Sequence, residues 1–440
     1  MSDQRVSDDL IHYPDLVSTL DTGRAGWRVI EQLVAGVVVV GLGLRVFIFS
    51  AVTPGTAMSA LLTPVLFINL RRYRWAVTFV ASALCACVSG WVLSALARPH
   101  YLVSSGNRLF WLTLILGLVF AVGAVAWART VLPRSMIGLL YGLGMLGSAL
   151  VSPDLHGDNP WKFALAVPVA VILLSLAGLS RARWLELAVL AVLGLASIIF
   201  DSRSYMATFL LAAVLVLWQF RPQNWSRRAS AARTAFLMAA SGAGVYILGS
   251  NLLVGGALGE QAQQRSIDQI RTAGNLILGG RPELAATLRL FAAHPFGFGF
   301  GVILGITEVG MAKQAMVDIH YNAADGYVET FMLGNGIELH SVIGDLWASC
   351  GLAGILLVVM IAALTGYGLA HFVALARCSA LVLFGACWTL WNLLFSPLYS
   401  SIPSMSLLLG LVLVVKKDKS SSMAEPGGPD ESATGQRDGE

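Results

Sequence analysis

The segment HSVIGDLWASCGLAGILLVVMIAALTGYGL, residues 340–369, places a histidine directly before a long apolar run. The run from Val342 to Leu369 is interrupted by Asp345 and by the glycine pair Gly351 and Gly354. About 20 predominantly apolar residues are enough for a helix to cross the hydrocarbon core of a bilayer. The segment therefore predicts a membrane-spanning helix that begins on a polar boundary.

Similar apolar runs fill most of the chain. Of its 440 residues, 56% are hydrophobic and 12% are charged, and the mean hydropathy is +0.73. Soluble domains carry roughly 25% charged residues, so the composition excludes an ordinary soluble protein. We expect an all-α polytopic membrane protein with about 12 transmembrane helices. The candidate spans are Val29–Phe49, Met58–Leu70, Trp75–Leu96, Leu109–Trp127, Met136–Val151, Trp161–Leu179, Leu185–Phe200, Ala207–Phe220, Ala235–Val254, Val342–Leu369, Ala380–Phe395 and Met405–Val415.

Basic residues in the short connections predict the orientation, because Lys and Arg beside a span are retained on the cytoplasmic side. With the N-terminus inside, the cytoplasmic connections contain most of these arginines, whereas the opposite short connections hold little beyond Arg98, Arg108 and Arg203. We therefore expect a cytoplasmic tail over 1–28, transmembrane helices 1–9 over 29–254, a large outer loop over 255–340, helices 10–12 over 341–415, and a disordered cytoplasmic tail over 416–440.

The outer loop is the candidate functional region, because most connections run to only about 2–8 residues. It carries Arg265, Arg271, Arg281 and Arg289, which cytoplasmic retention does not explain. Arg281 and Pro282 precede a helical pattern, so we expect a helix there. The arginines form either a solvated basic face or the binding site of an anionic ligand.

Arg203 stands where one span is expected to end on the outer side and the next to return. Its guanidinium either reaches the membrane interface, pairs with the neighbouring Asp201, or faces a phosphate. His340 is the residue best suited to accept a proton near neutral pH, although a histidine at this boundary is also compatible with an ordinary interfacial residue. His320, beside Tyr321 and Asn322, is the alternative histidine.

The segment His294-Pro-Phe-Gly-Phe-Gly-Phe-Gly301 alternates glycine with phenylalanine. We expect it to end a helix and to wedge its rings into the membrane interface. The outer loops carry no metal-ligand spacing, and the chain has no phosphate-binding G-x-x-x-x-G-K-[ST] loop. We therefore expect no metal, no other cofactor and no nucleic-acid partner.

Four of these elements, in this order, resemble the O-antigen ligase and O-antigen polymerase superfamily. They are Ser202-Arg203, Gly280-Arg281, the turn beginning at His294-Pro295, and His340-Ser341 followed after nine residues by Gly351-x-x-Gly354. The last pattern is closest to the lipopolysaccharide O-antigen ligases. The aromatic residue that often follows the family's loop arginine is not evident, since Ala285 and Ala286 stand there.

The resemblance implies a metal-independent glycosyltransferase of the bacterial inner membrane, with its active site on the periplasmic face. Its donor would be a polysaccharide on undecaprenyl diphosphate, and its acceptor the lipid A–core oligosaccharide in lipopolysaccharide biosynthesis. Arg203, Arg281 and Arg265 would bind the diphosphate, His340 would activate the acceptor hydroxyl, and transfer would invert the anomeric carbon. A polymerase acting on lipid-linked repeat units and a transporter of lipid-linked sugars are the alternatives.

Overall fold

The structure is a computed structural model that describes residues 15–180, 182–220, 259–273, 280–376 and 378–416, with scattered positions between 236 and 256. Side chains are described from residue 26 onward. Parts of the expected span Ala235–Val254, residues 1–14 of the expected N-terminal tail, and all but the first residue of the expected C-terminal tail lie outside this description.

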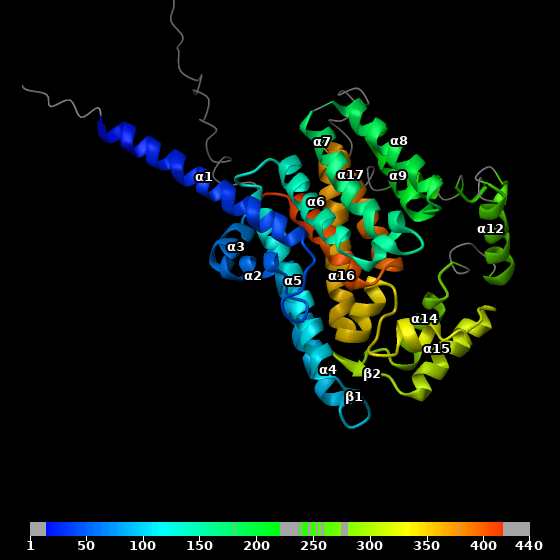
Figure 1. The fold of residues 1–440 in the computed structure, drawn as a ribbon. Coiled ribbons are helices and arrows are strands. Elements are labelled where there is room, and N and C mark those ends of the chain that lie inside the picture. The colour runs from blue at the N-terminus through cyan, green and yellow to red at the C-terminus, as the bar shows by residue number, and fades with distance from the viewer. Residues whose placement is uncertain are drawn as a thin grey trace, which may run out of the picture.

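The described chain is mostly helical, and its elements form a bundle with a smaller helical unit at one end (Figure 1). The N-terminal half contains α1 (Asp15–Gly43), α2 (Pro54–Leu61), α3 (Thr63–Leu70), α4 (Ala76–Ala97), β1 (Leu102–Val103), α5 (Ser105–Ala128), α6 (Arg134–Leu150), the short helices η1 (Pro153–His156) and η2 (Trp161–Leu165), α7 (Ala166–Leu179), α8 (Arg183–Ile199) and α9 (Arg203–Trp218). The remainder contains α12 (Glu260–Ala273), α14 (Glu283–Ala293), β2 (Val302–Ile303), α15 (Ile306–Asp318), the π-helix η3 (Val328–Met332), α16 (Val342–Ala374), α17 (Ala380–Phe395) and α18 (Leu398–Val412).

The predicted all-α class is confirmed, and the helices fit a membrane-embedded protein. Five of the described helices are long and apolar enough to cross a membrane, and α9, α17 and α18 are shorter apolar helices. Many large apolar side chains on these helices face outward, as on Val37, Val88 and Val359, which are more than half exposed. A belt of this kind is expected where lipid replaces water. These helices support a membrane-embedded protein but do not establish the 12 predicted spans.

Two predicted spans differ from the helices observed. The segment Met58–Leu70 is divided between α2 and α3, each of eight residues, because Pro64 in the first turn of α3 removes a backbone donor and restarts the helix. Neither half is long enough to span a bilayer alone. The segment Val29–Phe49 instead belongs to a helix that begins earlier, at Asp15, and ends at Gly43.

The helix α16 is broken at Gly351, whose φ of 61° and ψ of −142° lie outside the helical region. The break leaves carbonyl groups that other segments satisfy. The Ala348 carbonyl accepts hydrogen bonds from the backbone N–H groups of Phe298 (2.8 Å) and Gly299 (3.0 Å), and the Ser89 hydroxyl donates to the Cys350 carbonyl (2.8 Å). Interrupted helices are tolerated at membrane depth where protein groups replace the lost hydrogen bonds in this way.

The glycine-phenylalanine segment is therefore packed between α4 and the break in α16. Phe298 and Phe300 are almost completely buried, whereas Phe296 is 67% exposed. The expectation that these rings wedge into the membrane interface is wrong for Phe298 and Phe300. Gly299 has a φ of +107°, and a Cβ atom there would lie 2.2 Å from the Ser94 backbone nitrogen. Only glycine fits this approach to α4.

The expected loop 255–340 contains α12, α14, α15 and η3, and much of it has a core of its own. Buried side chains of Leu290, Met316 and Val328 belong to one cluster with Leu339 and with Trp347 of α16. A short antiparallel pair joins the region to the bundle, with Leu102 opposite Ile303 and Val103 opposite Val302. This packing fixes the segment between Val328 and Leu339, which directly precedes His340.

Replacing Gly299 with alanine tests the close approach of the glycine-phenylalanine segment to α4. We expect Gly299→Ala to lower the unfolding free energy by about 1–3 kcal/mol, because the added methyl group meets backbone and the positive φ is strained. Gly310→Ala is the matched control, since Gly310 lies in α15 with nothing within 4 Å of an added Cβ. Thermal unfolding in detergent measures both, and equal midpoints for the two variants would contradict the packing.

Candidate functional site

His340 is held by fixed contacts of the residues on either side of it. The preceding backbone N–H, from Leu339, donates to the Asp345 carboxylate at 2.7 Å. The following residue, Ser341, caps α16, since its hydroxyl oxygen accepts a hydrogen bond from the Gly344 N–H at 3.1 Å. His340 itself has a φ of 54°, in the left-handed region that few non-glycine residues adopt. The chain thus turns sharply at the histidine while both neighbours stay anchored.

The imidazole of His340 lies beside a tyrosine that is hydrogen-bonded to a buried carboxylate. Its ring centroid is 5.8 Å from that of Tyr327, and the Tyr327 hydroxyl donates to Oε1 of Glu283 at 2.6 Å. Nδ1 of His340 is 3.3 Å from the Glu338 carbonyl oxygen. A proton on Nδ1 would be donated to that carbonyl, which leaves the lone pair on Nε2 available to accept another proton.

Arg281 belongs to this group through Tyr327. It directly precedes Pro282, the N-cap of α14, so the predicted helix is confirmed, and its carbonyl accepts from the Leu284 N–H. Burial raises the pKa of Tyr327 well above its usual value, Glu283 raises it further, and the positive charge of Arg281 opposes both. The phenol therefore stays protonated as a donor. We refer to Arg281, Glu283, Tyr327 and His340 as the His340 cluster.

A second cation, Arg45, lies in the turn that follows α1. The guanidinium of Arg45 lies 3.7 Å from the ring centroid of Tyr399 and donates to the Tyr399 carbonyl at 2.9 Å. Partial removal from solvent raises the pKa of the Glu338 carboxyl, whereas the charges of His340 and Arg45 lower it. Arg45 is thus within electrostatic range of a residue that touches the histidine.

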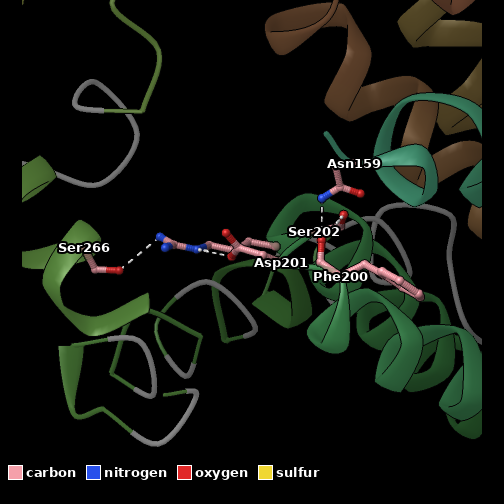
Figure 2. A network of polar contacts seen from close by, with 6 residues as sticks. Asn159, Phe200, Asp201, Ser202 and Ser266 are labelled. Carbon is pink, nitrogen blue, oxygen red and sulfur yellow. Dashed lines mark hydrogen bonds and ion pairs between the residues drawn. The ribbon is translucent and has the colours of Figure 1, made fainter. Parts of the chain in front are cut away.

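Arg203, the first residue of α9, belongs to a different set of contacts (Figure 2). Its Nη1 donates to the hydroxyl of Ser266 on α12 at 3.1 Å, and its Nε lies 3.6 Å from the Asp201 carboxylate. The predicted pairing with Asp201 is therefore present. Both side chains are partly exposed, 26% and 48%, so this ion pair contributes at most about 1 kcal/mol.

The structure brings together only two of the four predicted site residues. His340 and Arg281 share the His340 cluster, while the described contacts of Arg203 run to α12. Arg265 lies on α12 next to Ser266, but its side chain is outside the described residues. His320, the alternative histidine, is exposed after the end of α15, and the following Tyr321 donates to Asp325 at 3.0 Å.

Glu283, Tyr327, Arg45 and Glu338 were missed as site residues. Glu283 had a local signal, since it follows Arg281 by two positions in the first turn of a predicted helix. Arg45 stood out as an ionisable residue in an apolar run, where such residues are often functional. Tyr327 and Glu338 carry no pattern of their own, because tertiary packing alone brings them to the histidine. Within the described ranges, no group of three or more His, Cys, Asp or Glu side chains is placed to hold a metal ion.

Removing the Asp345 carboxylate should loosen the segment that carries His340. Asp345 accepts from the N–H groups of Leu339 (2.7 Å) and Leu398 (2.8 Å), and Asp345→Ala leaves both buried donors without this partner. Each unsatisfied buried donor costs about 1–3 kcal/mol. We expect a clearly lower unfolding midpoint in detergent, with exposed Asp318→Ala as the control. A wild-type midpoint for Asp345→Ala would refute this role.

Removing the Tyr327 hydroxyl should destabilise the His340 cluster without removing its ring contact. Glu283 is buried, and its Oε2 has no hydrogen-bond partner in the described part of the chain, so Tyr327→Phe leaves the carboxylate poorly satisfied. We expect a loss of about 1–3 kcal/mol in unfolding free energy. Tyr321→Phe, which removes a hydroxyl from the exposed Asp325, should change it by much less. Similar losses for both variants would show that Glu283 does not depend on Tyr327.

Comparisons of the chain with protein-family models, with curated proteins and with solved structures find no match. The site is therefore defined by the geometry of its residues.

Proposed function

We propose that the protein is a glycosyltransferase that moves a glycan from a polyprenyl diphosphate to a hydroxyl acceptor at the membrane surface. The observation that carries the proposal is the His340 cluster, in which the His340 ring lies against Tyr327 and the charge of Arg281 acts on the same tyrosine. This pairing supplies a proton acceptor and a cation, the two groups that such a transfer needs. The order of the motifs, which resembles the O-antigen ligases, selects this reaction among those that use the same groups.

In the proposed reaction, the acceptor oxygen attacks the anomeric carbon and the bond from that carbon to the diphosphate oxygen breaks. His340 takes the proton of the acceptor hydroxyl on Nε2, a contribution of about 10²–10⁴-fold in rate. The bonding electrons leave with the polyprenyl diphosphate. Arg281 stabilises the charge that develops there, an effect of roughly 3–4 kcal/mol per well-placed donor. A single displacement inverts the anomeric carbon.

Arg203 and Arg265 are assigned to the same diphosphate. The support is that α12, which carries Arg265, also supplies the hydroxyl that contacts Arg203. A diphosphate has more oxygen atoms than one guanidinium can bind, since each guanidinium donates bidentately at best. The undecaprenyl carrier, the lipid A–core acceptor and the periplasmic face of the bacterial inner membrane are parts of the proposal that rest on the motif resemblance.

Purified full-length protein in detergent tests the proposal directly. It is incubated with undecaprenyl-diphosphate-linked glycan and lipid A–core, without ATP and with a chelator, and the glycosylated product is measured. We expect transfer to proceed, His340→Ala to slow it about 10²–10⁴-fold and Arg281→Ala about 10²–10³-fold. His320→Ala and Arg289→Ala are the controls, because both residues are exposed in the same region.

Wild-type transfer by both His340→Ala and Arg281→Ala would refute the assignment of the site. Replacing lipid A–core with a lipid-linked repeat unit as acceptor separates a ligase from a polymerase by the product formed. Absence of product with either acceptor, in a protein that still unfolds cooperatively, would refute glycosyl transfer.

A further inference from the structure

A second concave site lies at the end of the bundle opposite His340. Its volume is about 380 Å³, and its lining includes Asn69, Arg72, Tyr73, Arg129 and Arg134. The helix α4 separates the two ends. Just beyond the C-terminus of α4, the Tyr101 hydroxyl donates to Glu308 of α15 at 2.7 Å. Just before the N-terminus of α4, the Arg74 guanidinium donates to the Tyr367 hydroxyl, late in α16, at 2.7 Å. A helix of 22 residues is about 33 Å long.

The walls of this basic pocket are formed by three connections that are bonded to one another. Tyr73 pairs with Val415 in an antiparallel bridge. The Arg74 N–H donates to the Val414 carbonyl, and the Lys416 N–H donates to the Arg72 carbonyl, both at 2.8 Å. The Tyr73 hydroxyl donates to the Ala126 carbonyl at 2.9 Å. The turn after α3, the end of α5 and the segment after α18 therefore form a preformed surface.

The charge of the basic pocket is positive and uncompensated by carboxylates. Three arginines line it, and no Asp or Glu is among the described lining residues. Nη1 of Arg129 donates to the Gly410 and Leu413 carbonyls at 2.8 and 2.9 Å. Burial, with a smaller contribution from the charge of Arg134, lowers the pKa of Arg129 to about 10. Partly buried groups of like charge repel one another, and an anion among them relieves that repulsion.

A neutral side chain in the lining is also consistent with a bound anion. Asn69 is only 5% exposed, and its side-chain amide nitrogen has no hydrogen-bond partner among the described residues. A buried donor of this kind normally has an acceptor. Positive-charge retention beside a span explains arginines but does not explain an unsatisfied amide in the same lining. Together the arginines and Asn69 match an oxygen-rich anion.

We propose that the basic pocket binds the phosphate group of an anionic phospholipid. The pocket lies where the apolar helices α3, α5 and α18 end, which is the level at which lipid headgroups are found. Basic pockets between membrane helices commonly bind such headgroups. The site is independent of the proposed glycosyl transfer, since it shares no residue with the His340 cluster.

Native mass spectrometry of the full-length protein in detergent tests this site. The protein is titrated with phosphatidylglycerol and, separately, with phosphatidylcholine. We expect phosphatidylglycerol to bind at least tenfold more tightly. Arg72→Gln should weaken its binding about fivefold, the effect of one basic residue near a headgroup. The Arg72 side chain is exposed, so this variant should fold normally.

Two further variants separate a specific site from general surface charge. Arg98→Gln removes the same charge from an exposed residue at the opposite end of α4 and should leave binding unchanged. Asn69→Leu keeps the net charge and the approximate volume but should weaken binding severalfold. Equal affinity for the two lipids, equal effects of Arg72→Gln and Arg98→Gln, or wild-type binding by Asn69→Leu would each overturn the proposal. Displacement of the lipid by equimolar inorganic phosphate would assign the pocket to a soluble phosphate and would also overturn it.

Discussion

The two hydrogen bonds accepted by Asp345 are the interaction on which the arrangement of the site depends. One comes from Leu339, just before His340, and the other from Leu398, at the start of α18. Asp345 is 1% exposed, and its carboxylate accepts from backbone donors of two segments that are far from each other in the sequence. Because an unsatisfied buried carboxylate is costly, the position of these segments relative to α16 is fixed. The neighbouring Tyr399, whose ring and carbonyl hold Arg45, is fixed by the same contact.

The break at Gly351 has a comparable effect on the other side of α16. It exposes the Ala348 carbonyl to Phe298 and Gly299, so that the segment after α14 is fastened to the bundle. A continuous helix would use that carbonyl internally and would leave the segment unattached. The glycine requirement at Gly351 and Gly299 is therefore geometric: each lets one backbone approach another more closely than a side chain allows.

The arginines of this chain make different contacts, which their sequence context does not distinguish. The charge of Arg281 acts on Tyr327, Arg203 reaches α12, and Arg129 caps the end of α18 in the basic pocket. Each guanidinium presents several donors in a plane, so it can bind carbonyls and still attract an anion. The geometry of its neighbours decides which of these a given arginine does.

The sequence by itself determined the class of the protein and part of the site. Long apolar runs with few charges dictate helices, because backbone groups in lipid must be bonded within the helix. The position of α14 after Pro282 and of α16 after Ser341 followed from local signals. Tertiary structure alone decided that Pro64 divides one apolar run, that Phe298 and Phe300 are buried, and that Arg281 joins His340 while Arg203 contacts α12. The physical reason is that helical periodicity reports which residues are apolar, whereas contacts such as those of Tyr327 and Asp345 join segments far apart in the chain and leave no local pattern.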